Sequence, residues 1–406
     1  MKVFFLIRNF PILSQTFVID NILSVAEEKI PFKILTYKKN EVYKNVADSS
    51  KVKDYIKEKN IEEIKEQSSG FIRFFESILY LLNPKKFYFF LKLSILRKKL
   101  SFSHIYQMKS FSKIGKDSVL HVHFANSIYH MKDFLKVGFI SPNVIVSIHG
   151  KDTIWLERFV RHNSNVELLE STVNKFLCNS RFTKEKLLEY GFSSKKLKVH
   201  YLGIDTFFFR PYQTTKTITN ELNLISVGRL IQLKGHYYAI LAVEKLVLNG
   251  VNVRYKIIGE GPEFLPLSKM IKEKKLDNIV ELCGRMNKLE IKHELNNSDL
   301  FLFPSTFCDK TKRREAFGIA SLEAQSMGLP VIGFNSGGFV ETIIDNQTGY
   351  IVEDRNSDEL AYRIQNLYND NKLLMKMCKN AKSHVREHFD ARKSNQLLLN
   401  LYKQKN

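Results

Sequence analysis

The feature that most constrains the fold of this chain is an alternation of short apolar runs with longer amphipathic stretches. Residues 1–7 form the first apolar run, residues 16–28 an amphipathic stretch, and residues 32–35 the next run. Short apolar runs are typical of buried strands, whereas apolar residues spaced three and four apart are typical of a helix. The order strand, helix, strand favours a parallel sheet covered by helices.

The alternation is interrupted once, between residues 202 and 220, and then begins again. The interruption contains Gly203, Pro211 and a polar stretch over 213–220, a composition typical of linkers. We therefore predict an N-terminal Rossmann-like α/β domain over 1–210, a second over 211–380, and a C-terminal helix over 381–406 that returns to pack on the first domain. Two such domains imply a cleft, with ligands at the carboxyl ends of the strands.

Further elements are expected from the same alternation. The first domain should have strands at 119–122, 144–148, 176–178 and 197–201. The second should have strands at 223–227, 254–258, 279–282, 300–303 and 330–333, with helices at 236–248 and 262–274.

The composition excludes several classes of protein. With 406 residues, 44% of them hydrophobic, the chain can bury large cores and is not a disordered protein. Its four cysteines lie far apart without a Cys-x-x-Cys pair, so neither a metal knuckle nor a disulfide framework is indicated, and a reducing compartment fits. No apolar run is long enough to span a bilayer, and the N-terminus lacks a signal peptide pattern. We expect a cytoplasmic protein, soluble or peripheral on the membrane.

Positive charge is concentrated in the first half of the chain. The formal net charge is +21, and residues 1–210 contain 35 lysines and arginines against 20 acids. The segment 71–116 has ten basic residues, one acid and eleven phenylalanines or tyrosines. We expect it to contact an anionic membrane surface; an internal helix with a solvated basic face is the alternative. Basic and aromatic residues in one segment are also typical of nucleic-acid-binding proteins. Such a protein is the alternative from a different functional class.

Two cations flank a loop that follows the first strand of the second domain. Arg229 and Lys234 lie between Gly228 and Gly235, just before the predicted helix at 236–248. An arginine fork and a lysine point charge beside a helix N-terminus can hold a diphosphate. Cations that flank a loop are also often merely solvated, so this spacing alone leaves both interpretations open.

Two glutamates enclose a second turn. Glu315 precedes Phe317-Gly318-Ile319, whose amides open a helix, and Glu323 follows about two turns later. Carboxylates placed around a polyhydroxylated ligand can each accept hydroxyl hydrogens, although glutamates eight apart also occur on ordinary exposed helices. The preceding Arg313 and Arg314 are expected to decorate the loop rather than to contact phosphate.

The histidines of the first domain need separate consideration. His121 and His123 alternate with Val122 on a predicted strand, so both should point to one face, as structure or cleft lining rather than as metal ligands. His149 follows the predicted strand 144–148 and precedes a glycine, which places it at the carboxyl edge of the sheet.

The absence of two motifs limits the cofactors and metals that we expect the chain to use. The turn after the first strand lacks Gly-x-Gly-x-x-Gly, which makes a bound NAD or FAD unlikely. No Asp-x-Asp triplet occurs anywhere in the chain, so a metal-bridged diphosphate is unsupported. We expect no metal and no cofactor; Arg229, Lys234 and helix-end amides would replace the metal's electrostatic role.

Several motifs together resemble a known family. In the second half they are Gly228-Arg229-x4-Lys234-Gly235, Ile258-Gly259-Glu260-Gly261-Pro262, Glu315-x7-Glu323, Gly328-Leu329-Pro330-Val331-Ile332 and Gly337-Gly338-x2-Glu341. In this order and spacing, the sequence resembles the retaining nucleotide-sugar glycosyltransferases of family 4, which have the GT-B fold. In the first half, Phe10-Pro11-x2-Ser14, His121-x-His123-Phe124 and Ser147-Ile148-His149-Gly150-x-Asp152 look like the branch that builds bacterial exopolysaccharide and lipopolysaccharide.

The resemblance implies a role for each candidate residue. Gly228, Arg229 and Lys234 would hold the donor diphosphate, and Glu323 would accept hydrogen bonds from the ribose hydroxyls. Glu315 would contact the sugar hydroxyls. The remaining implied contacts are the amides of Phe317, Gly318 and Ile319 to phosphate and sugar, Arg285 and Met286 to the base, and His149 towards the transferred sugar.

The resemblance also implies an activity. A sugar would pass from a UDP- or GDP-sugar to a hydroxyl of a growing, lipid-linked surface glycan such as capsule or lipopolysaccharide, with retention of the anomeric configuration. The alternative within the same fold is a cytosolic transferase with a soluble acceptor.

Overall fold

The computed structural model describes residues 1–12, 16–40, 50–64, 70–101, 103–150, 152–160, 163–212 and 221–404. These residues form two compact units. The first unit comprises Met1–Asn179, Thr183–Tyr201 and the chain from Asn395 onward, and the second comprises Ser180–Phe182 and Leu202–Ser394. The boundary that we expected at residue 210 lies inside the second unit, and the polar stretch 213–220 lies outside the described residues.

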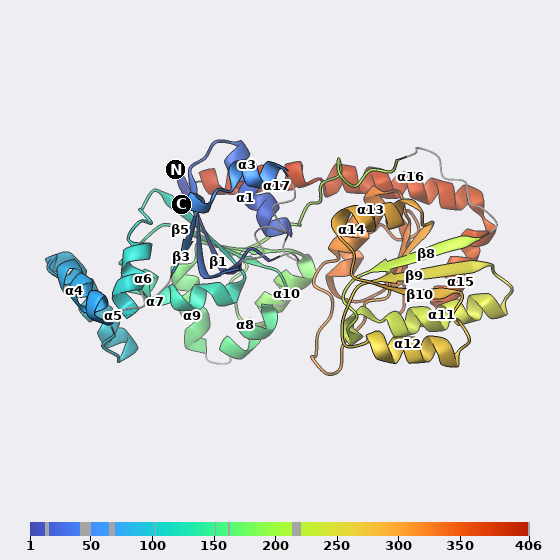
Figure 1. Ribbon diagram of the computed structural model, residues 1–406, viewed down its shortest axis with the longest axis horizontal. Coiled ribbons are helices and arrows are strands. Elements are labelled where there is room, and N and C mark those ends of the chain that lie inside the picture. Colours follow the sequence, from blue (N-terminus) through green and yellow to red (C-terminus); the bar gives the residue numbers. More distant parts are fainter. Residues whose placement is uncertain are drawn as a thin grey trace. The chain divides into compact units, whose positions relative to one another are not determined.

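The first unit is built on a parallel sheet of seven strands in the order β3-β2-β1-β4-β5-β6-β7 (Figure 1). From β1 the chain builds outwards through β2 to β3 and then returns to place β4 on the other side of β1. This reversal is the topological switch point at which α/β sheets bind ligands. The strands are β1 (Lys2–Phe10), β2 (Phe32–Lys39), β3 (Ile61–Glu63), β4 (Ser118–His123), β5 (Asn143–Ile148), β6 (Lys175–Cys178) and β7 (Leu197–Val199).

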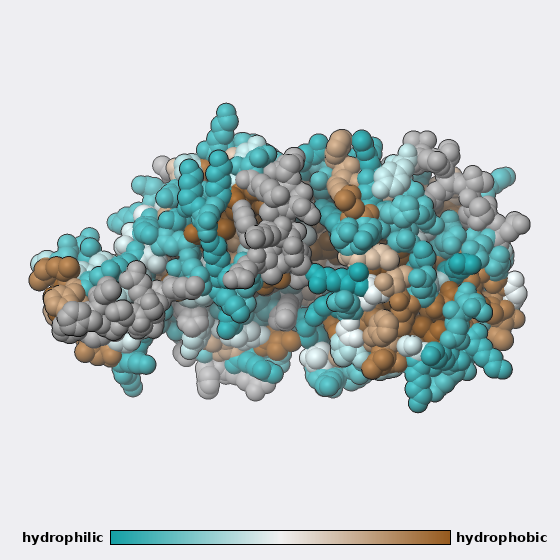
Figure 2. Space-filling model, viewed as in Figure 1, coloured by the Kyte–Doolittle hydropathy of each residue, from teal (hydrophilic) through white to brown (hydrophobic). Residues whose placement is uncertain are grey.

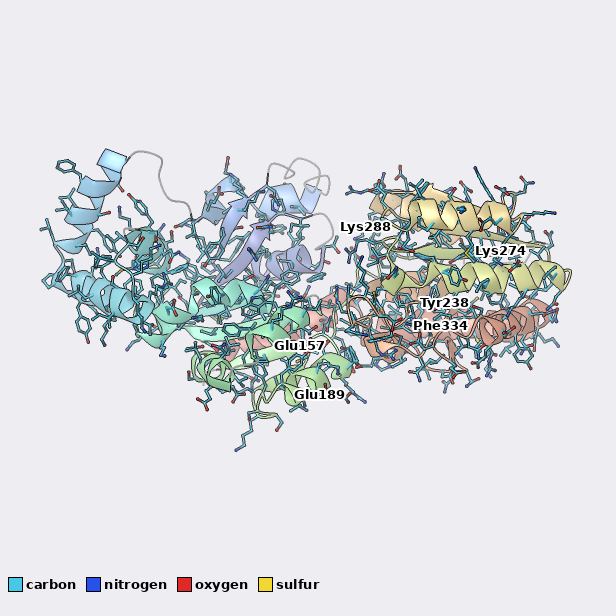
Figure 3. The ribbon with its side chains drawn as sticks, turned by 90° about the horizontal axis from the view of Figure 1, so that it is seen from below. Glu157, Glu189, Tyr238, Lys274, Lys288 and Phe334 are labelled. Carbon is cyan, nitrogen blue, oxygen red and sulfur yellow. The ribbon has the colours of Figure 1, made fainter. Side chains whose placement is uncertain are left out.

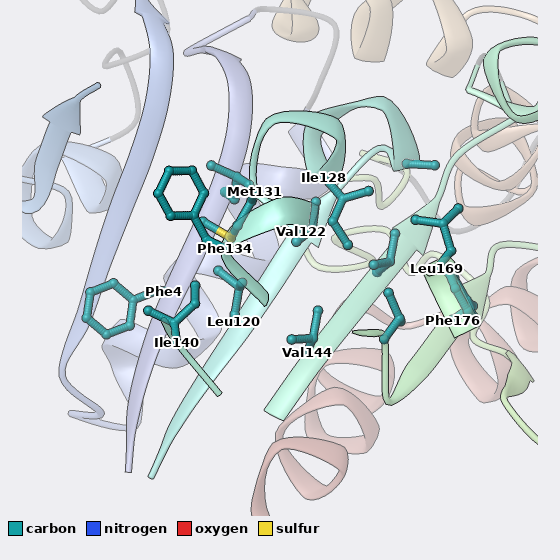
Figure 4. Close-up of a cluster of buried hydrophobic side chains, with 14 of the residues drawn as sticks. Phe4, Leu120, Val122, Ile128, Met131, Phe134, Ile140, Val144, Leu169 and Phe176 are labelled. Carbon is teal, nitrogen blue, oxygen red and sulfur yellow. The ribbon is translucent and has the colours of Figure 1, made fainter. Parts of the chain in front are cut away.

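One face of this sheet carries a large hydrophobic core. Side chains alternate between the two faces of a strand, so Phe4 and Leu120 point to this face together with Val144 and Phe176 (Figure 4). The helices of the unit are α3 (Ser50–Tyr55), η1 (Glu58–Asn60), α4 (Gly70–Leu81), α5 (Pro84–Arg97), α6 (Ser103–Phe111), η2 (Ala125–His130), α7 (Lys132–Lys136), α8 (Thr153–Phe159), α9 (Asn163–Thr172), α10 (Arg181–Glu189), and α1 and α17, described next.

The opposite face is covered by helices from the two ends of the chain, α1 (Thr16–Glu27) and α17 (Ala391–Lys403). Phe5 of β1 and Ile22 of α1 share a buried cluster with Leu398 of α17. The Asn21 side chain donates a hydrogen bond to Asn395 Oδ1 at 2.9 Å. The last helix therefore completes the core of the first unit.

The second unit repeats the same strand order in a six-stranded parallel sheet, β10-β9-β8-β11-β12-β13. Its strands are β8 (Leu222–Val227), β9 (Val253–Ile258), β10 (Val280–Gly284), β11 (Leu300–Phe303), β12 (Val331–Phe334) and β13 (Gly349–Val352). Its helices are η3 (Gln232–Lys234), α11 (His236–Leu248), α12 (Phe264–Glu273), α13 (Lys288–Asn296), α14 (Ile319–Ser326), η4 (Gly337–Thr342), α15 (Ser357–Asn369) and α16 (Asn371–His388). Tyr238 of α11 and Phe334 of β12 meet edge to face in its core, with ring centroids 5.9 Å apart (Figure 3).

The observed elements confirm the α/β fold class and two parallel-sheet domains. Helix α11 and strand β11 have the bounds expected from the sequence, 236–248 and 300–303. The short strands β3 and β13 were not expected. The predicted C-terminal segment 381–406 contains the end of α16, in the second unit, and all of α17. Among the described helices, none combines the length and hydropathy that a membrane span requires.

Candidate functional site

The carboxyl edge of the second sheet is shaped by glycines that let loops approach one another. A Cβ atom on Gly259 would lie 1.8 Å from the Gly228 carbonyl oxygen, and one on Gly261 would lie 2.2 Å from the Leu230 carbonyl oxygen. The Leu230 amide donates to the Glu260 carbonyl at 2.8 Å. The Ile258–Pro262 motif therefore braces the loop that carries Arg229 and Lys234.

Lys234 forms an ion pair at this edge. Its Nζ lies 2.6 Å from Glu315 Oε2 and 5.0 Å from the centroid of the Phe303 ring. The next residue, Gly235, has a φ of +61°, and a Cβ there would lie 1.9 Å from the Pro304 carbonyl oxygen. Only glycine fits this left-handed, crowded position, so the turn places the Lys234 ammonium between a carboxylate and an aromatic face.

The partners in this pair are mostly buried, with 18% of the Lys234 side chain and 19% of the Glu315 side chain exposed. Burial acts to raise the pKa of Glu315, but the Lys234 ammonium, with smaller contributions from Arg313 and the Ala316 amide, holds that pKa below its ordinary value. Glu315 is therefore a carboxylate at neutral pH. Lys234, for which the spacing alone left a solvated cation and a diphosphate ligand open, is one half of a partly desolvated pair.

The residues around Glu315 are fixed by close backbone approaches. The Gly338 amide donates to the Glu315 carbonyl at 2.8 Å, and a Cβ on Gly337 would lie 2.1 Å from the same oxygen. Gly318, with a φ of +127°, is the N-cap of α14, and Phe317 is buried. Since α14 begins at Ile319, Glu323 lies about one turn into the helix, not two as the sequence suggested.

The other predicted contacts lie along the same edge. Arg229 is exposed on the loop after β8, and Arg285 is exposed after β10, next to the half-buried Met286. Gly228 packs against Lys234, because a Cβ there would lie 3.3 Å from Lys234 Cε. The structure does not bring Arg229, Arg285 or Met286 into a recorded contact with the Lys234–Glu315 pair, so their roles in ligand binding stay predictions.

Arg314 has a structural role that the sequence did not reveal. We expected it to decorate the loop, but its Nη1 donates to Asp354 Oδ2 at 2.8 Å and to Ser336 Oγ at 3.1 Å. Its guanidinium also lies 5.2 Å from the Phe307 ring centroid. The expectation was wrong because the partners lie 40 and 22 positions away, which no local pattern indicates.

The carboxyl edge of the first sheet holds a cluster of histidines. His121 Nε2 is 2.7 Å from Ser147 Oγ and His121 Nδ1 is 2.5 Å from Tyr402 Oη. His123 Nδ1 is 3.2 Å from His149 Nε2, and these two rings stack at 5.4 Å. His121 and His123 point to the same face, as predicted. Ser147 appears in the sequence motif, whereas nothing in the sequence indicated Tyr402.

Burial keeps these imidazoles neutral. It lowers the pKa of His123 to about 3. Burial, followed by the neighbouring imidazoles, lowers the pKa values of His121 and His149 well below the ordinary value. Beside them, Asp152 accepts from the Ala125 and His149 amides at 2.9 and 3.0 Å, yet burial raises its pKa to about 6.

Within the described ranges, no group of three or more His, Cys, Asp or Glu side chains is arranged to hold a metal ion. Metal independence of the reaction stays a prediction.

Comparison with known proteins shows the fold of the chain and the family that it resembles. Residues 213–384 match the sequence model of the family described as Glycosyl transferases group 1. The solved structures that resemble the whole chain are GT-B glycosyltransferases, in agreement with two parallel-sheet α/β units. The chain therefore has the GT-B fold, and most of its second unit resembles the group 1 glycosyl transferases.

Two relatives and one solved structure show what the chain is similar to. The chain is 25% identical over 99% of both chains to WcaL of Escherichia coli K12, assigned as a colanic acid biosynthesis glycosyltransferase. It is 29% identical to the amylovoran biosynthesis glycosyltransferase AmsK of Erwinia amylovora, over 60% of this chain and 59% of that protein. The crystal structure of Anabaena HepE with UDP and glucose superposes with a TM-score of 0.75 at 17% identity, covering 100% of both chains.

Proposed function

We propose that this protein is a retaining glycosyltransferase that moves a sugar from a nucleotide diphosphate sugar to a hydroxyl of a growing, lipid-linked bacterial surface glycan. The relatives named for colanic acid and amylovoran biosynthesis support a polysaccharide product. The structure of HepE with UDP and glucose supports a nucleotide-sugar donor.

The observation that carries the proposal is the Lys234–Glu315 pair at the switch point of the second sheet. Departure of the sugar leaves negative charge on the diphosphate, and a preorganised cation lowers that barrier. A lysine ammonium has three hydrogen-bond donors. One is directed at Glu315, which leaves two for diphosphate oxygens, and Arg229 would supply a second cation from the same loop.

Glu315 has a different part in this proposal. Because its pKa is held below the ordinary value, it is ionised and cannot act as the acid that protonates a leaving group. It can accept hydrogen bonds from sugar hydroxyls while it orients Lys234. Glu323, one turn into α14, is proposed to accept from the ribose, and His149 to contact the transferred sugar.

The pairing of Lys234 with a carboxylate also bears on retention. The carboxylate at this site is already engaged by a cation, so it is a poor candidate for the nucleophile of a double displacement. We therefore propose that the acceptor hydroxyl attacks on the face from which the diphosphate leaves.

Donor screening tests the proposal. Calorimetry with UDP-, GDP- and ADP-sugars should identify one nucleotide that binds, since a ligand at 100 times its dissociation constant stabilises a protein by about 2.7 kcal/mol. The NMR coupling at the anomeric carbon of the product should match that of the donor. An inverted product would refute the retaining mechanism, and a lack of binding by all nucleotide sugars would refute the proposed donor.

A further inference from the structure

Helices α4 and α5 carry an unusual number of exposed apolar side chains. Figure 1 shows both helices at the margin of the first unit, with α6 and α7 between them and the sheet. Large hydrophobic side chains gather there on the surface in Figure 2. Those that are exposed are Phe75, Ile78, Leu79, Leu82, Phe87, Tyr88, Leu91, Ile95 and Leu100.

These side chains form stripes rather than scattered positions. On α4 and just beyond it, Ile78, Leu79 and Leu82 are spaced one and three residues apart, which places them on one helical face. On α5, Leu91 and Ile95 are four residues apart, whereas the side of α5 that packs inwards holds the buried Leu93. Leu82 is 70% exposed and Ile95 is 76% exposed. Contiguous exposed apolar side chains such as these mark an interaction site on a protein surface.

Basic side chains surround the stripes. Lys85, Lys92, Lys98 and Lys99 are exposed, and none of them forms an ion pair with a residue that the structure describes. The one acid of the segment, Glu76, is paired with Lys109 at 2.7 Å. The surface therefore presents apolar side chains and uncompensated positive charge together.

Arg97 does not belong to this set. Its Nε donates to Asp133 Oδ2 at 2.7 Å and its Nη1 to Gln107 at 3.0 Å, and only 19% of its side chain is exposed. A count of basic residues in the sequence includes Arg97, but the structure assigns it to the packing between α5 and α7.

We propose that the α4–α5 surface, defined by Ile78, Leu79, Leu82, Leu91 and Ile95 with the four lysines above, docks the protein on an anionic lipid bilayer. Apolar helical faces enter the boundary between headgroups and acyl chains, while lysine stems lie along the apolar surface with their ammonium groups at the headgroups. Lysine is depleted in the cores of protein–protein interfaces, which makes a protein occupant a poorer fit. The proposal places the first unit on the surface of the bilayer.

Vesicle sedimentation with full-length protein tests this proposal. Wild type should bind vesicles with 30% phosphatidylglycerol but not pure phosphatidylcholine, and salt should weaken binding. Replacing Lys85, Lys92, Lys98 and Lys99 by Gln should lower partitioning at least tenfold, since one lysine near an anionic leaflet changes it about fivefold, or about 1 kcal/mol. The matched control replaces the exposed Lys272, Lys372, Lys376 and Lys379 of the second unit and should bind like wild type.

The apolar part has its own test. A triple Ser variant at Leu79, Leu82 and Ile95 should lose binding to anionic vesicles, whereas a triple Ser variant at the exposed Leu248, Leu265 and Leu289 of the second unit should retain it. Brominated lipid should quench a tryptophan placed at residue 79 but not one placed at residue 248.

Three results would overturn the proposal. One is equal sedimentation of the α4–α5 variants and their controls. Another is the absence of quenching at residue 79. The third is a dimer in sedimentation equilibrium that the triple Ser variant at Leu79, Leu82 and Ile95 abolishes, which would assign the surface to a second copy of the chain. Nucleotide binding measured on each variant separates this proposal from the proposed transferase activity, because it should not change.

Discussion

The two sheets have the same strand order around their switch points, yet their carboxyl edges differ in charge. The second sheet places a mostly buried ion pair, Lys234 with Glu315, at that edge. The first sheet places His121, His123 and His149 there, and burial keeps them neutral. The difference shows that one α/β topology can present either fixed charge, suited to a diphosphate, or neutral donors and acceptors, suited to hydroxyl groups.

Removal of Lys234 should change activity and stability more than any other substitution at these two edges. Lys234→Ala should lower turnover about a hundredfold, because an electrostatic donor to the leaving group is lost. It should also destabilise the fold by about 3 to 5 kcal/mol, since the Glu315 carboxylate would remain buried without its partner. Turnover assays and urea unfolding measure the two effects.

Two further variants sharpen this prediction. The exposed Arg229 provides the matched control: Arg229→Ala should lower turnover by a similar factor and change stability by less than about 0.5 kcal/mol. Adding Glu315→Gln to Lys234→Ala should restore much of the stability but no activity. Normal turnover of both single variants would contradict the diphosphate assignment.

The two glutamates should differ in the step that they affect. Glu323→Ala should weaken binding of the nucleoside diphosphate about 10- to 100-fold, the range expected for a hydrogen bond to a charged group. Glu315→Gln should slow transfer by a larger factor than it changes that affinity. Calorimetry and single-turnover kinetics measure the two quantities, and an equal loss of nucleoside diphosphate affinity in both variants would reverse the assigned roles.

The neutral histidines predict a pH dependence of stability. The pKa of His123 is about 3 in the folded protein against 6.5 for an ordinary histidine, so the unfolded chain binds the extra proton between these values. Stability should therefore fall as pH decreases from 6.5 towards 3, by about 1.4 kcal/mol per pH unit for this residue. His121 and His149 act in the same direction, whereas Asp152, with its pKa raised to about 6, acts in the opposite one.

A variant isolates the contribution of His123. His123→Gln should show a shallower slope than wild type in urea unfolding between pH 4 and 6. Val122→Ala, a neighbouring buried substitution without a titrating group, gives the reference slope. Parallel curves for all three proteins would show that His123 is not held neutral.

Chelation should have the smallest effect. If Arg229 and Lys234 supply the positive charge that a metal ion would otherwise supply, activity should be unchanged in EDTA. Complete loss of activity that Mg²⁺ or Mn²⁺ restores would contradict this prediction, because a metal ion would then supply the positive charge at the second sheet.

The sequence predicted those parts of the molecule whose signals are local. Periodicity located β8, α11 and β11, and glycine spacing located the loop that carries Lys234. It could not reveal that Lys234 and Glu315 form a pair, because 81 positions separate them. The contact between His121 and Tyr402 spans 281 positions, and the shortness of β3 and β13 leaves little periodicity to detect. The membrane contact expected of segment 71–116 rested on its basic and aromatic content, and only the structure shows which apolar side chains of α4 and α5 are exposed.

The return of α17 to the first sheet has a consequence for biosynthesis. Leu398 and Tyr402 fill the same core as Phe5, so the first unit cannot complete its packing until the ribosome has released the last helix. The N-terminal half must therefore wait, partly assembled, while the second unit is translated and can fold. A truncation before Asn395 would expose the part of this apolar face that α17 covers, and such chains should depend on chaperones and be removed rapidly by proteases.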